Sequence, residues 1–222
     1  MEINSKIAEL MGIIVGDGNI TLKQGIKYRL IITGHSIDDK NYLTTYVSDL
    51  LYKLFKKKPT IWKHKNKNAI ALAFHSKEII SYFVKDLGLV NGPKKDLKIP
   101  QLILESNKKI KSSFLRGFAD TDFSVTFKKK QRKTHSYPVI HGYTNSLNLA
   151  KQIKKMLFEF DIKSNIYEKK MFLNGLKIGY QLDVYGRNNF SNWLTKIGFK
   201  NEKHTSKISI WRKHGHYLPK NR

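Results

Sequence analysis

The stretch LMGIIVGDG at residues 10–18 decides the fold, because the chain repeats it in altered form as LRGFADTDF at residues 115–123. Each copy is an apolar helical pattern that ends in an acid, Asp17 in the first copy and Asp122 in the second. Each copy also has two small residues four positions apart, a spacing that places both on one face of a helix. These small residues are Gly12 and Gly16 in the first copy and Gly117 and Thr121 in the second. Because small side chains let two backbones approach closely, we expect the two helices to pack along this face and to bring both acids to one end.

The acids at that shared end predict a cation site. Two carboxylates held close together repel each other unless positive charge lies between them, and Mg²⁺ prefers carboxylate and phosphate oxygens together with retained waters. Asp120 also lies in the second copy, but its counterpart in the first copy is Val15. We therefore expect Asp120 to take part in polar packing and not to bind metal.

Composition indicates a folded protein that binds nucleic acid. The 222 residues include 42 Lys and Arg against 17 Asp and Glu, a formal net charge of +25. A chain this basic repels itself unless it binds a polyanion, and nucleic acid is the leading candidate. A ribosomal or other generic basic protein is the alternative at this level. No apolar run approaches the length of a membrane span, so we expect no membrane partner.

The two copies of the stretch belong to a longer internal duplication. Residues 83–91 line up with residues 193–201, ending in Asn91 and Asn201, and the pattern Lys-x3-Lys-Ile at residues 94–99 returns at residues 203–208. The offset between matched positions stays between 105 and 110 from end to end. A near-constant offset implies two related halves.

Periodicity within each half predicts the same order of elements: helix, two strands, helix, two strands, helix. The predicted elements of the first half are a helix at 5–15, strands at 20–23 and 26–33, a helix after Asp38 or Asp39, strands at 60–65 and 69–75, and a helix at 76–87. Those of the second half are a helix capped at 106–107, strands at 124–130 and 137–144, a helix at 146–160, strands at 163–170 and 176–185, and a helix at 188–197. We predict an N-terminal lobe at 1–105, a linker at 94–106, and a C-terminal lobe at 106–222 that ends in a basic tail.

On these residues the chain resembles the LAGLIDADG homing endonucleases. The nine-letter motif of that family lies over both stretches without a gap, and its acidic eighth position falls on Asp17 and Asp122. The second copy departs from the motif at Phe123, where the family has glycine. The resemblance implies an α+β fold of two αββαββα lobes, related by a pseudo-twofold axis, with saddle-shaped antiparallel sheets. Because the chain has no cysteine and intein splicing often needs an N-terminal one, we expect the free-standing, monomeric type.

The resemblance also implies a function. The family cuts both strands of a long, asymmetric DNA site across the minor groove, in a reaction that depends on a divalent metal. Asp17 and Asp122 would be the catalytic and metal-binding acids, each serving mainly one strand. The expected cofactor is Mg²⁺ or Mn²⁺, with Ca²⁺ as a non-catalytic occupant, and the expected partner is double-stranded DNA. We expect an intron-encoded protein located in the cytoplasm, or in an organellar matrix if the source is eukaryotic.

Basic residues near the acids are expected to help at the phosphate. Lys98 and Lys207 are the first choices for catalytic lysines, with Lys94 and Lys203 behind them, and solvated linker lysines are the alternative. His35 ends the second predicted strand, where family members often carry a residue that orders water. The alternative for His35 is a surface histidine before a helix cap, and its counterparts in the second half are Thr144 and Asn145.

Specificity is expected to come from the strands, because a two-stranded ribbon fits the major groove and its outward side chains alternate. Arginines would read guanine, while most lysines would hold phosphates. The candidate DNA-binding residues are Lys23, Lys27, Arg29, Trp62, His64 and Lys65 in the first half, and Lys128, Lys130, Arg132, His141, Tyr167, Lys169 and Lys177 in the second. The basic segments 129–135 and 211–217 are expected along DNA, with disorder as the alternative for the second.

Two rival functions remain open from the sequence. One is a binding protein that does not cut, either an RNA maturase that helps its own intron splice or a degenerate homing protein that binds DNA, and Phe123 favours it. The other is a transcription factor on the same fold. Intact Asp17 and Asp122 favour the enzyme.

Overall fold

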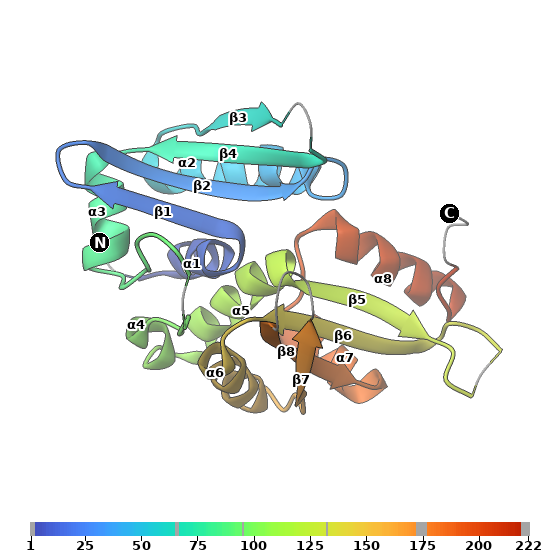
Figure 1. Ribbon diagram of the computed structural model, residues 1–222. Coiled ribbons are helices and arrows are strands. Elements are labelled where there is room, and N and C mark those ends of the chain that lie inside the picture. The colour runs from blue at the N-terminus through green and yellow to red at the C-terminus, as the bar shows by residue number, and fades with distance from the viewer. Residues whose placement is uncertain (1–2, 65–66, 95, 132, 172–176, 219–222) are drawn as a thin grey trace.

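Two helices, α1 (Ser5–Asp17) and α5 (Lys108–Asp122), lie side by side at the centre of the molecule, with one four-stranded sheet on each side of the pair (Figure 1). The structure is a computed structural model, and it describes residues 3–64, 67–94, 96–131, 133–171 and 177–218. Asn4 caps α1 by accepting from the amides of Lys6 and Ile7, so the cap lies one residue before the predicted Ser5. Asn107 caps α5 in the same way.

The small residues of the two helices form the crossing, as the spacing predicts. A side-chain carbon added at Gly12 would collide with the backbone oxygen of Phe114, and one added at Gly117 would collide with the backbone oxygen of Glu9. One added at Gly16 would collide with Thr121 and with the carboxylate of Asp122. The helices therefore touch backbone to backbone, and glycine is required at the contact.

Both sheets are antiparallel and have the same strand order, which confirms the duplication and the α+β fold of two related units. The first sheet has the order β1-β2-β4-β3 and the second the order β5-β6-β8-β7. The strands are β1 (Gly18–Lys23), β2 (Lys27–His35), β3 (Thr60–Lys63), β4 (Ala69–His75), β5 (Phe123–Lys128), β6 (Tyr137–Thr144), β7 (Asn165–Met171) and β8 (Lys177–Tyr185).

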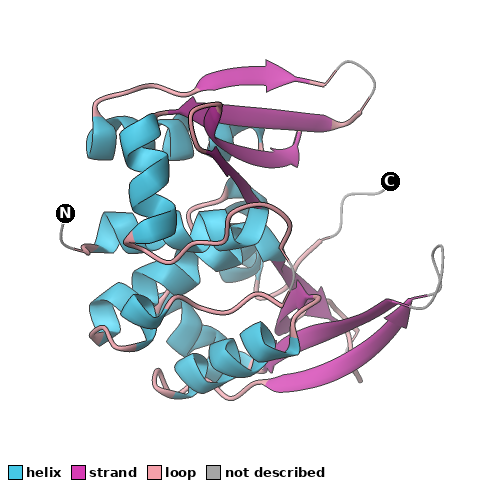
Figure 2. Cartoon of the chain, turned by 60° about the vertical axis from the view of Figure 1, so that its left-hand side comes forward, coloured by secondary structure: helices cyan, strands magenta, loops and turns pink. Residues whose placement is uncertain are grey.

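The remaining helices cover one side of the sheets and leave the other side open, so that in Figure 2 the helices stand together on the left and both sheets extend to the right. They are the π-helix η1 (Tyr42–Val47), α2 (Ser48–Phe55), α3 (Lys77–Lys85), α4 (Gln101–Leu104), α6 (Leu147–Phe158), α7 (Arg187–Lys196) and α8 (Glu202–His214). Among the described residues, no helix has the length and apolar character that crossing a membrane requires.

The C-terminal segment 211–217 is folded and not disordered, and its contact with DNA stays a prediction. Residues 202–214 form α8, and Trp211 stacks on Phe127 with ring centroids 5.5 Å apart and meets Phe190 edge to face. The indole of Trp211 also donates to the backbone oxygen of Ser136. Aromatic burial thus fixes this segment onto the second sheet.

Phe123 causes no change of backbone shape at the junction of helix and strand. Its φ and ψ are −107° and 161°, and those of Gly18, its counterpart in the first half, are −80° and 150°. Both are extended conformations that any residue adopts. The Phe123 ring is buried against Phe118 and Trp193, in space left by Gly142 on the neighbouring strand. The departure from the motif is therefore accommodated in the core.

Candidate active site

The structure brings the two acids of the repeated stretch to the same end of the helix pair. Asp17 is the last residue of α1 and Asp122 is the last residue of α5. The carboxylate of Asp122 lies against the backbone of Gly16, one residue from Asp17. Both side chains are half-buried, and each is followed at once by the first strand of its sheet.

Burial makes both acids hard to ionise, and at Asp122 the charge of Asp17 adds to this effect. Burial raises the pKa of Asp17 to about 6, against the opposing charges of Lys203 and Lys94. Burial and then the charge of Asp17 raise the pKa of Asp122 to about 7, although the Thr121 hydroxyl donates to its carboxylate over 2.9 Å. A bound cation would stabilise the ionised form of two carboxylates whose pKa values are raised in this way.

In each half, a lysine reaches the C-terminal end of the motif helix of that same half. The ammonium of Lys94 donates to the backbone oxygens of Val15, at 2.8 Å, and of Gly16. The ammonium of Lys203 lies 3.4 Å from the backbone oxygen of Thr121, the residue that corresponds to Gly16. Burial lowers the pKa of Lys94, and the charges of Asp122 and Asp17 oppose that shift.

The first-choice lysines lie farther from the helix ends than the second choices, and the catalytic role of all four stays a prediction. Lys98 is exposed, and Lys207 is half-buried with its ammonium 3.5 Å from the backbone oxygen of Val125. Lys94 and Lys203, the second choices, are the ones that approach the ends of α1 and α5. In α8, Lys203 lies in the first turn and Lys207 one turn later, so only the former points back to α5.

His35 lies beside a polar network that joins the two halves. Its ring nitrogen Nδ1 is 3.2 Å from a carboxylate oxygen of Asp38, and its backbone amide donates to Asp39. Asp39 in turn binds Lys203 at 2.9 Å and the side-chain amide of Asn201 at 2.8 Å.

Asp120 belongs to the same network and takes the expected role in polar packing. It is fully buried and accepts from the backbone amides of Lys200 and Asn201. Burial raises its pKa to about 7.

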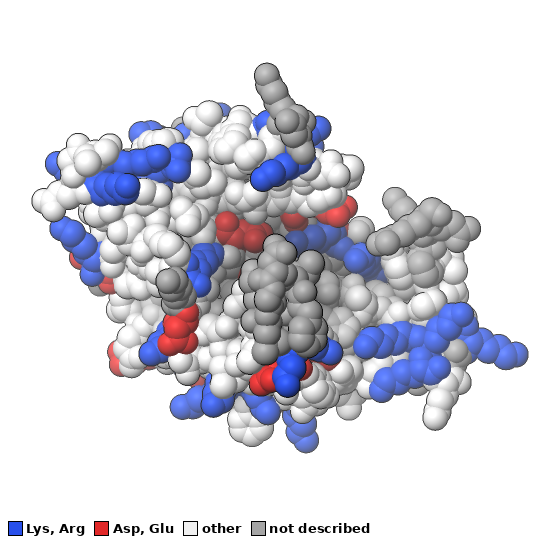
Figure 3. Space-filling view, in the orientation of Figure 1, with Lys and Arg blue, Asp and Glu red and all other residues white. Residues whose placement is uncertain are grey.

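Two hollows flank the pair of acids. One, of about 190 Å³, is lined on the Asp122 side by residues that include Lys94, Thr144 and Asn145. The other, of about 550 Å³, is lined by residues that include Asp38, Ser124, Lys203 and Lys207. Figure 3 shows acidic side chains in the hollow between the two lobes, with basic side chains beside them.

The donor set fits a hard divalent cation held together with substrate. Among the described residues no group of three or more His, Cys, Asp or Glu side chains comes together. Mg²⁺ usually binds to one or two carboxylates and completes its shell with phosphate oxygens and water. Asp17 and Asp122 supply such a pair, at a place where extra positive charge relieves their repulsion.

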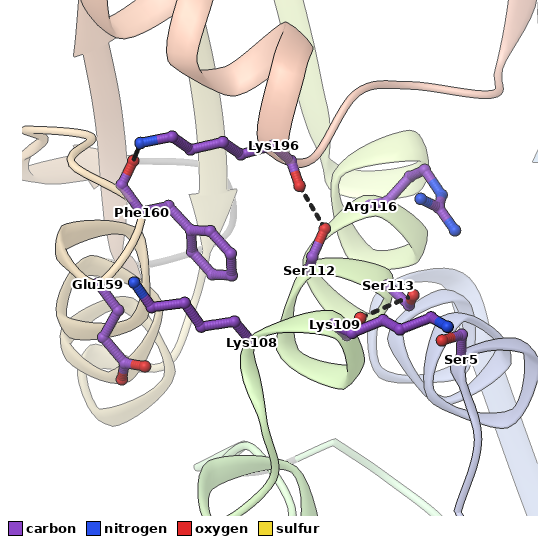
Figure 4. Close-up of a pocket in the computed structure, with 9 residues that line it drawn as sticks. All are labelled: Ser5, Lys108, Lys109, Ser112, Ser113, Arg116, Glu159, Phe160 and Lys196. Carbon is purple, nitrogen blue, oxygen red and sulfur yellow. Dashed lines mark hydrogen bonds between the residues drawn. The ribbon is translucent and has the colours of Figure 1, made fainter.

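A larger cavity, of about 600 Å³, lies at the other end of α5 and is separate from this site (Figure 4). Several of its polar groups are paired within the protein: Lys196 donates to the backbone oxygen of Phe160, and the hydroxyls of Ser112 and Ser113 donate to the backbone oxygens of Lys196 and Lys109. It shares no residue with the acid pair.

The predicted DNA-binding residues lie mostly on exposed strand positions and hairpins. Lys23, Lys27, Lys128, Lys130, Trp62, Tyr167 and Lys169 are exposed, while Arg29, His64 and His141 are half-buried. The ammonium of Lys130 stands 3.8 Å from the ring centroid of Tyr137, and Trp62 packs on His64 at 4.5 Å. Lys65 and Arg132 lie outside the described residues, as does the side chain of Lys177. Contact with DNA remains a prediction for all of them.

Comparison with known proteins supports the resemblance to the LAGLIDADG homing endonucleases. Residues 109–198 match the model of the LAGLIDADG-like domain. The second half of the chain is therefore similar to a LAGLIDADG-like domain. Among solved structures, homing endonuclease I-DmoI in complex with DNA and Ca has a TM-score of 0.62 at 17% identity, over 92% of this chain and 97% of that one. I-DmoI with DNA and Mn gives 0.60 at 18% identity, over 87% and 96%.

The LAGLIDADG fold is also shared with a protein whose name mentions no endonuclease. Full-length DUF199/WhiA from Thermatoga maritima has a TM-score of 0.57 at 18% identity, over 97% of this chain and 62% of that one. The fold is therefore shown, and the chemistry has to be argued from the site.

Curated relatives cover most of this chain, but the chain covers little of them. The replicative DNA helicase DnaB of Rhodothermus marinus is 25% identical over 85% of this chain and 20% of its own length. The tRNA-splicing ligase RtcB of Methanocaldococcus jannaschii is 28% identical over 87% and 22%, and the replication factor C small subunit of the same organism is 29% identical over 93% and 10%. The chain thus spans about a tenth to a fifth of these relatives.

Sequence reasoning missed two clusters of polar side chains. Glu9 and Arg116 form a buried ion pair between α1 and α5, and Asp183 holds three side chains on the open face of the second sheet. Glu9 is an acid within an apolar helical pattern, and that conflict was a usable signal. Asp183 lies between the buried Leu182 and Val184, so strand alternation places it on the outer face but says nothing of its partners.

Proposed function

We propose that this protein is a divalent-metal-dependent, site-specific endonuclease that cuts both strands of DNA. The observation that carries the proposal is the pair formed by Asp17 and Asp122, two desolvated acids at one end of paired helices, with a lysine beside each helix end. A net charge of +25 and two sheets open on the same side of the molecule support a DNA duplex as the partner.

The chain's own residues divide the work at the phosphodiester. Asp17 and Asp122 would hold the metal, which when bound lowers the pKa of a water and neutralises charge on the scissile phosphate and leaving oxygen. Lys94 and Lys203 place positive charge at the two helix ends, where it stabilises the developing negative charge. Because the two halves are related by duplication, each half presents one acid and one lysine, and each set serves one strand.

The differing names of the curated relatives support the interpretation that this segment moves between genes. Their names describe a helicase, an RNA ligase and a replication factor, yet the same stretch of about two hundred residues recurs in each. A segment common to such different proteins does not carry the activity that any of their names describes. A DNA endonuclease that inserts its own coding sequence into new sites fits this distribution, and the intron location expected from the sequence stays a separate proposal.

The test is cleavage of a plasmid that carries the DNA sequence flanking the protein's own gene, with Mg²⁺ or Mn²⁺. The wild type should make one double-strand break, whereas Asp17→Asn and Asp122→Asn should bind the same DNA and make no double-strand break. Either variant cutting both strands would overturn the assignment of the acids. Binding without cleavage by the wild type, or tighter binding to intron RNA, would favour the rival function of a maturase or DNA-binding protein.

A second readout does not depend on activity. Titration of Ca²⁺ into the wild type bound to DNA should release heat with saturation, and Asp17→Asn together with Asp122→Asn should remove that signal. Saturation that survives the double change would place the metal elsewhere.

A further inference from the structure

The open face of the second sheet carries a buried carboxylate that the proposed cleavage mechanism does not use. Asp183 on β8 is 2% exposed, although the adjacent Leu182 and Val184 are the residues that face the core. Strand alternation therefore turns Asp183 to the outer face. An acid on a surface that meets DNA phosphates is unfavourable unless other side chains cover it and satisfy it.

Three side chains cover Asp183 and donate to it. The imidazole Nδ1 of His141 lies 2.6 Å from one carboxylate oxygen, the amide of Gln181 donates to both oxygens at 2.8 and 2.9 Å, and the hydroxyl of Tyr185 donates over 2.5 Å. Burial would raise the pKa of Asp183, but the hydrogen bonds from Tyr185, Gln181 and His141 hold it below its ordinary value. The acid is thus ionised and fully engaged within the protein.

Strand register places this cluster in a row that crosses the whole sheet. Ser124 pairs with His141, His141 pairs with Asp183, and Asp183 pairs with Asn165. Ser124 follows Asp122 by two residues, so the row lies close to the proposed cleavage site. The first sheet has the corresponding row, but with different chemistry: Asn19, Ile31, Ala73 and Thr60.

We propose that Asp183 is a positioning residue that fixes the imidazole of His141 for reading one base pair in the DNA half-site bound by the second sheet. This inference rests on the proposed function, since it assigns a role in target recognition to the open face of that sheet. The ring of His141 is held through Nδ1, which leaves Nε2 as the nitrogen for a base edge. That nitrogen accepts from the amino group of adenine or cytosine when the ring is neutral, and donates to guanine when it is charged.

The difference between the two rows makes the two half-sites unequal. Ile31 and Ala73 offer methyl groups where the second sheet offers an anchored imidazole, and methyl groups favour contact with the thymine methyl. The two rows would therefore prefer different base pairs, and this difference alone makes the target asymmetric at the two positions that they face.

The anchoring can be measured without DNA. In the ¹⁵N-labelled full chain, the side-chain spectrum of His141 should show a protonated Nδ1 with a strongly deshielded proton, and Asp183→Asn should remove that signal. A wild-type ring with an unprotonated Nδ1 would overturn the positioning role, whatever the protein does to DNA.

The reading role is tested by selection from a randomised DNA duplex library, with Ca²⁺ present so that bound DNA stays intact. Asp183→Asn should reduce the preference at one base pair by about tenfold, and His141→Ala should change the same base pair. The combined variant should lose no more than His141→Ala alone, because both changes remove one interaction.

A matched control removes the same charge elsewhere in the lobe. Asp161→Asn changes an exposed carboxylate that pairs with Lys196, and it should leave every base preference as in the wild type. A wild-type preference that survives Asp183→Asn overturns the positioning proposal alone. A wild type that selects no sequence at all overturns the reading role together with the proposed function, while the spectrum still reports on the contact with Asp183.

Discussion

At the scale of single residues, the chemistry of the site depends on acids that the protein holds away from water. Asp17 and Asp122 have pKa values of about 6 and about 7, against an ordinary value of 3.8. The folded protein therefore binds protons that the unfolded chain releases. Their contribution to stability is complete below about pH 4 and is lost as the pH rises through the folded values.

Replacing both acids should remove this dependence. We expect the free energy of unfolding of the variant Asp17→Asn, Asp122→Asn, measured without metal, to exceed that of the wild type by about 1–3 kcal/mol at pH 8 and by little at pH 4. Urea unfolding across this range is the measurement. The wild type has to be compared with the variant because a second group changes stability with pH. Burial lowers the pKa of His204 to about 3, so this histidine makes both proteins more stable as the pH rises. A constant difference across the range would contradict the raised pKa values.

The lysines give a second prediction at this scale. Lys94→Met or Lys203→Met should slow cleavage by about 10²-fold, the size expected for losing a positive charge that stabilises the transition state. Lys98→Met, the matched change at an exposed position in the same loop, should have a smaller effect. Single-turnover cleavage of the target plasmid compares them, and a loss in Lys98→Met as large as in the other two would contradict the role assigned to Lys94 and Lys203.

The sequence located the two acids at one end of the helix pair but could not single out which lysine of each repeat lies beside a helix end, for a physical reason. The acids were found because each ends a helix that recurs at a fixed offset, so their pairing follows from helix packing alone. The repeat Lys-x3-Lys contains two lysines in each half, and the sequence spacing is the same for both. Only the path of the chain after α3 and the start of α8 decides which ammonium reaches a helix end.

At the scale of elements, the contact between α1 and α5 is set by backbone atoms. Gly12→Ala or Gly117→Ala would insert a methyl group into the backbone of the partner helix. We expect each to lower the free energy of unfolding by more than about 3 kcal/mol, although alanine normally stabilises a helix interior by about 1 kcal/mol relative to glycine. Lys109→Ala, which introduces the same residue at an exposed position of α5, should stay within about 0.5 kcal/mol. Denaturant unfolding measures these free energies. A Gly12→Ala variant more stable than the wild type would mean that α1 and α5 lie farther apart than the structure shows.

The order of helices and strands was predictable because each apolar pattern agrees with its partner in the other half. The bounds shifted by one to three residues at several ends. The helix α8 was missed because its buried residues are few, His204 and Ile208, so its sequence has little periodicity. The π-helix η1 was likewise hidden, since its apolar residues fit an ordinary helix equally well.

At the scale of the whole molecule, the two halves are joined by an interface that is not symmetric. Glu9 is 3% exposed and receives two hydrogen bonds from the guanidinium of Arg116, while the hydroxyl of Tyr46 donates to it over 2.6 Å. The duplication matches Glu9 with Phe114 and Arg116 with Met11. Each half thus carries a charge that only the other half neutralises.

Breaking this pair on one side should be costly. Glu9→Met or Arg116→Met should lower the free energy of unfolding by about 3–5 kcal/mol, because each leaves a buried charge without its partner. The double change should cost less than either single one, since it removes both charges. A double-mutant cycle by urea unfolding gives the coupling, and additive losses would show that the pair is not the source of the effect.

The buried pair of Glu9 and Arg116 also limits how such a protein is recombined. A hybrid enzyme that joins residues 1–105 to a lobe from another source would inherit a carboxylate facing whatever side chain the new lobe presents. Two copies of the same half, joined head to head, would confront acid with methionine or arginine with phenylalanine. Engineers who exchange lobes to obtain new target sites would therefore need to carry this one contact across together with the DNA-facing strands.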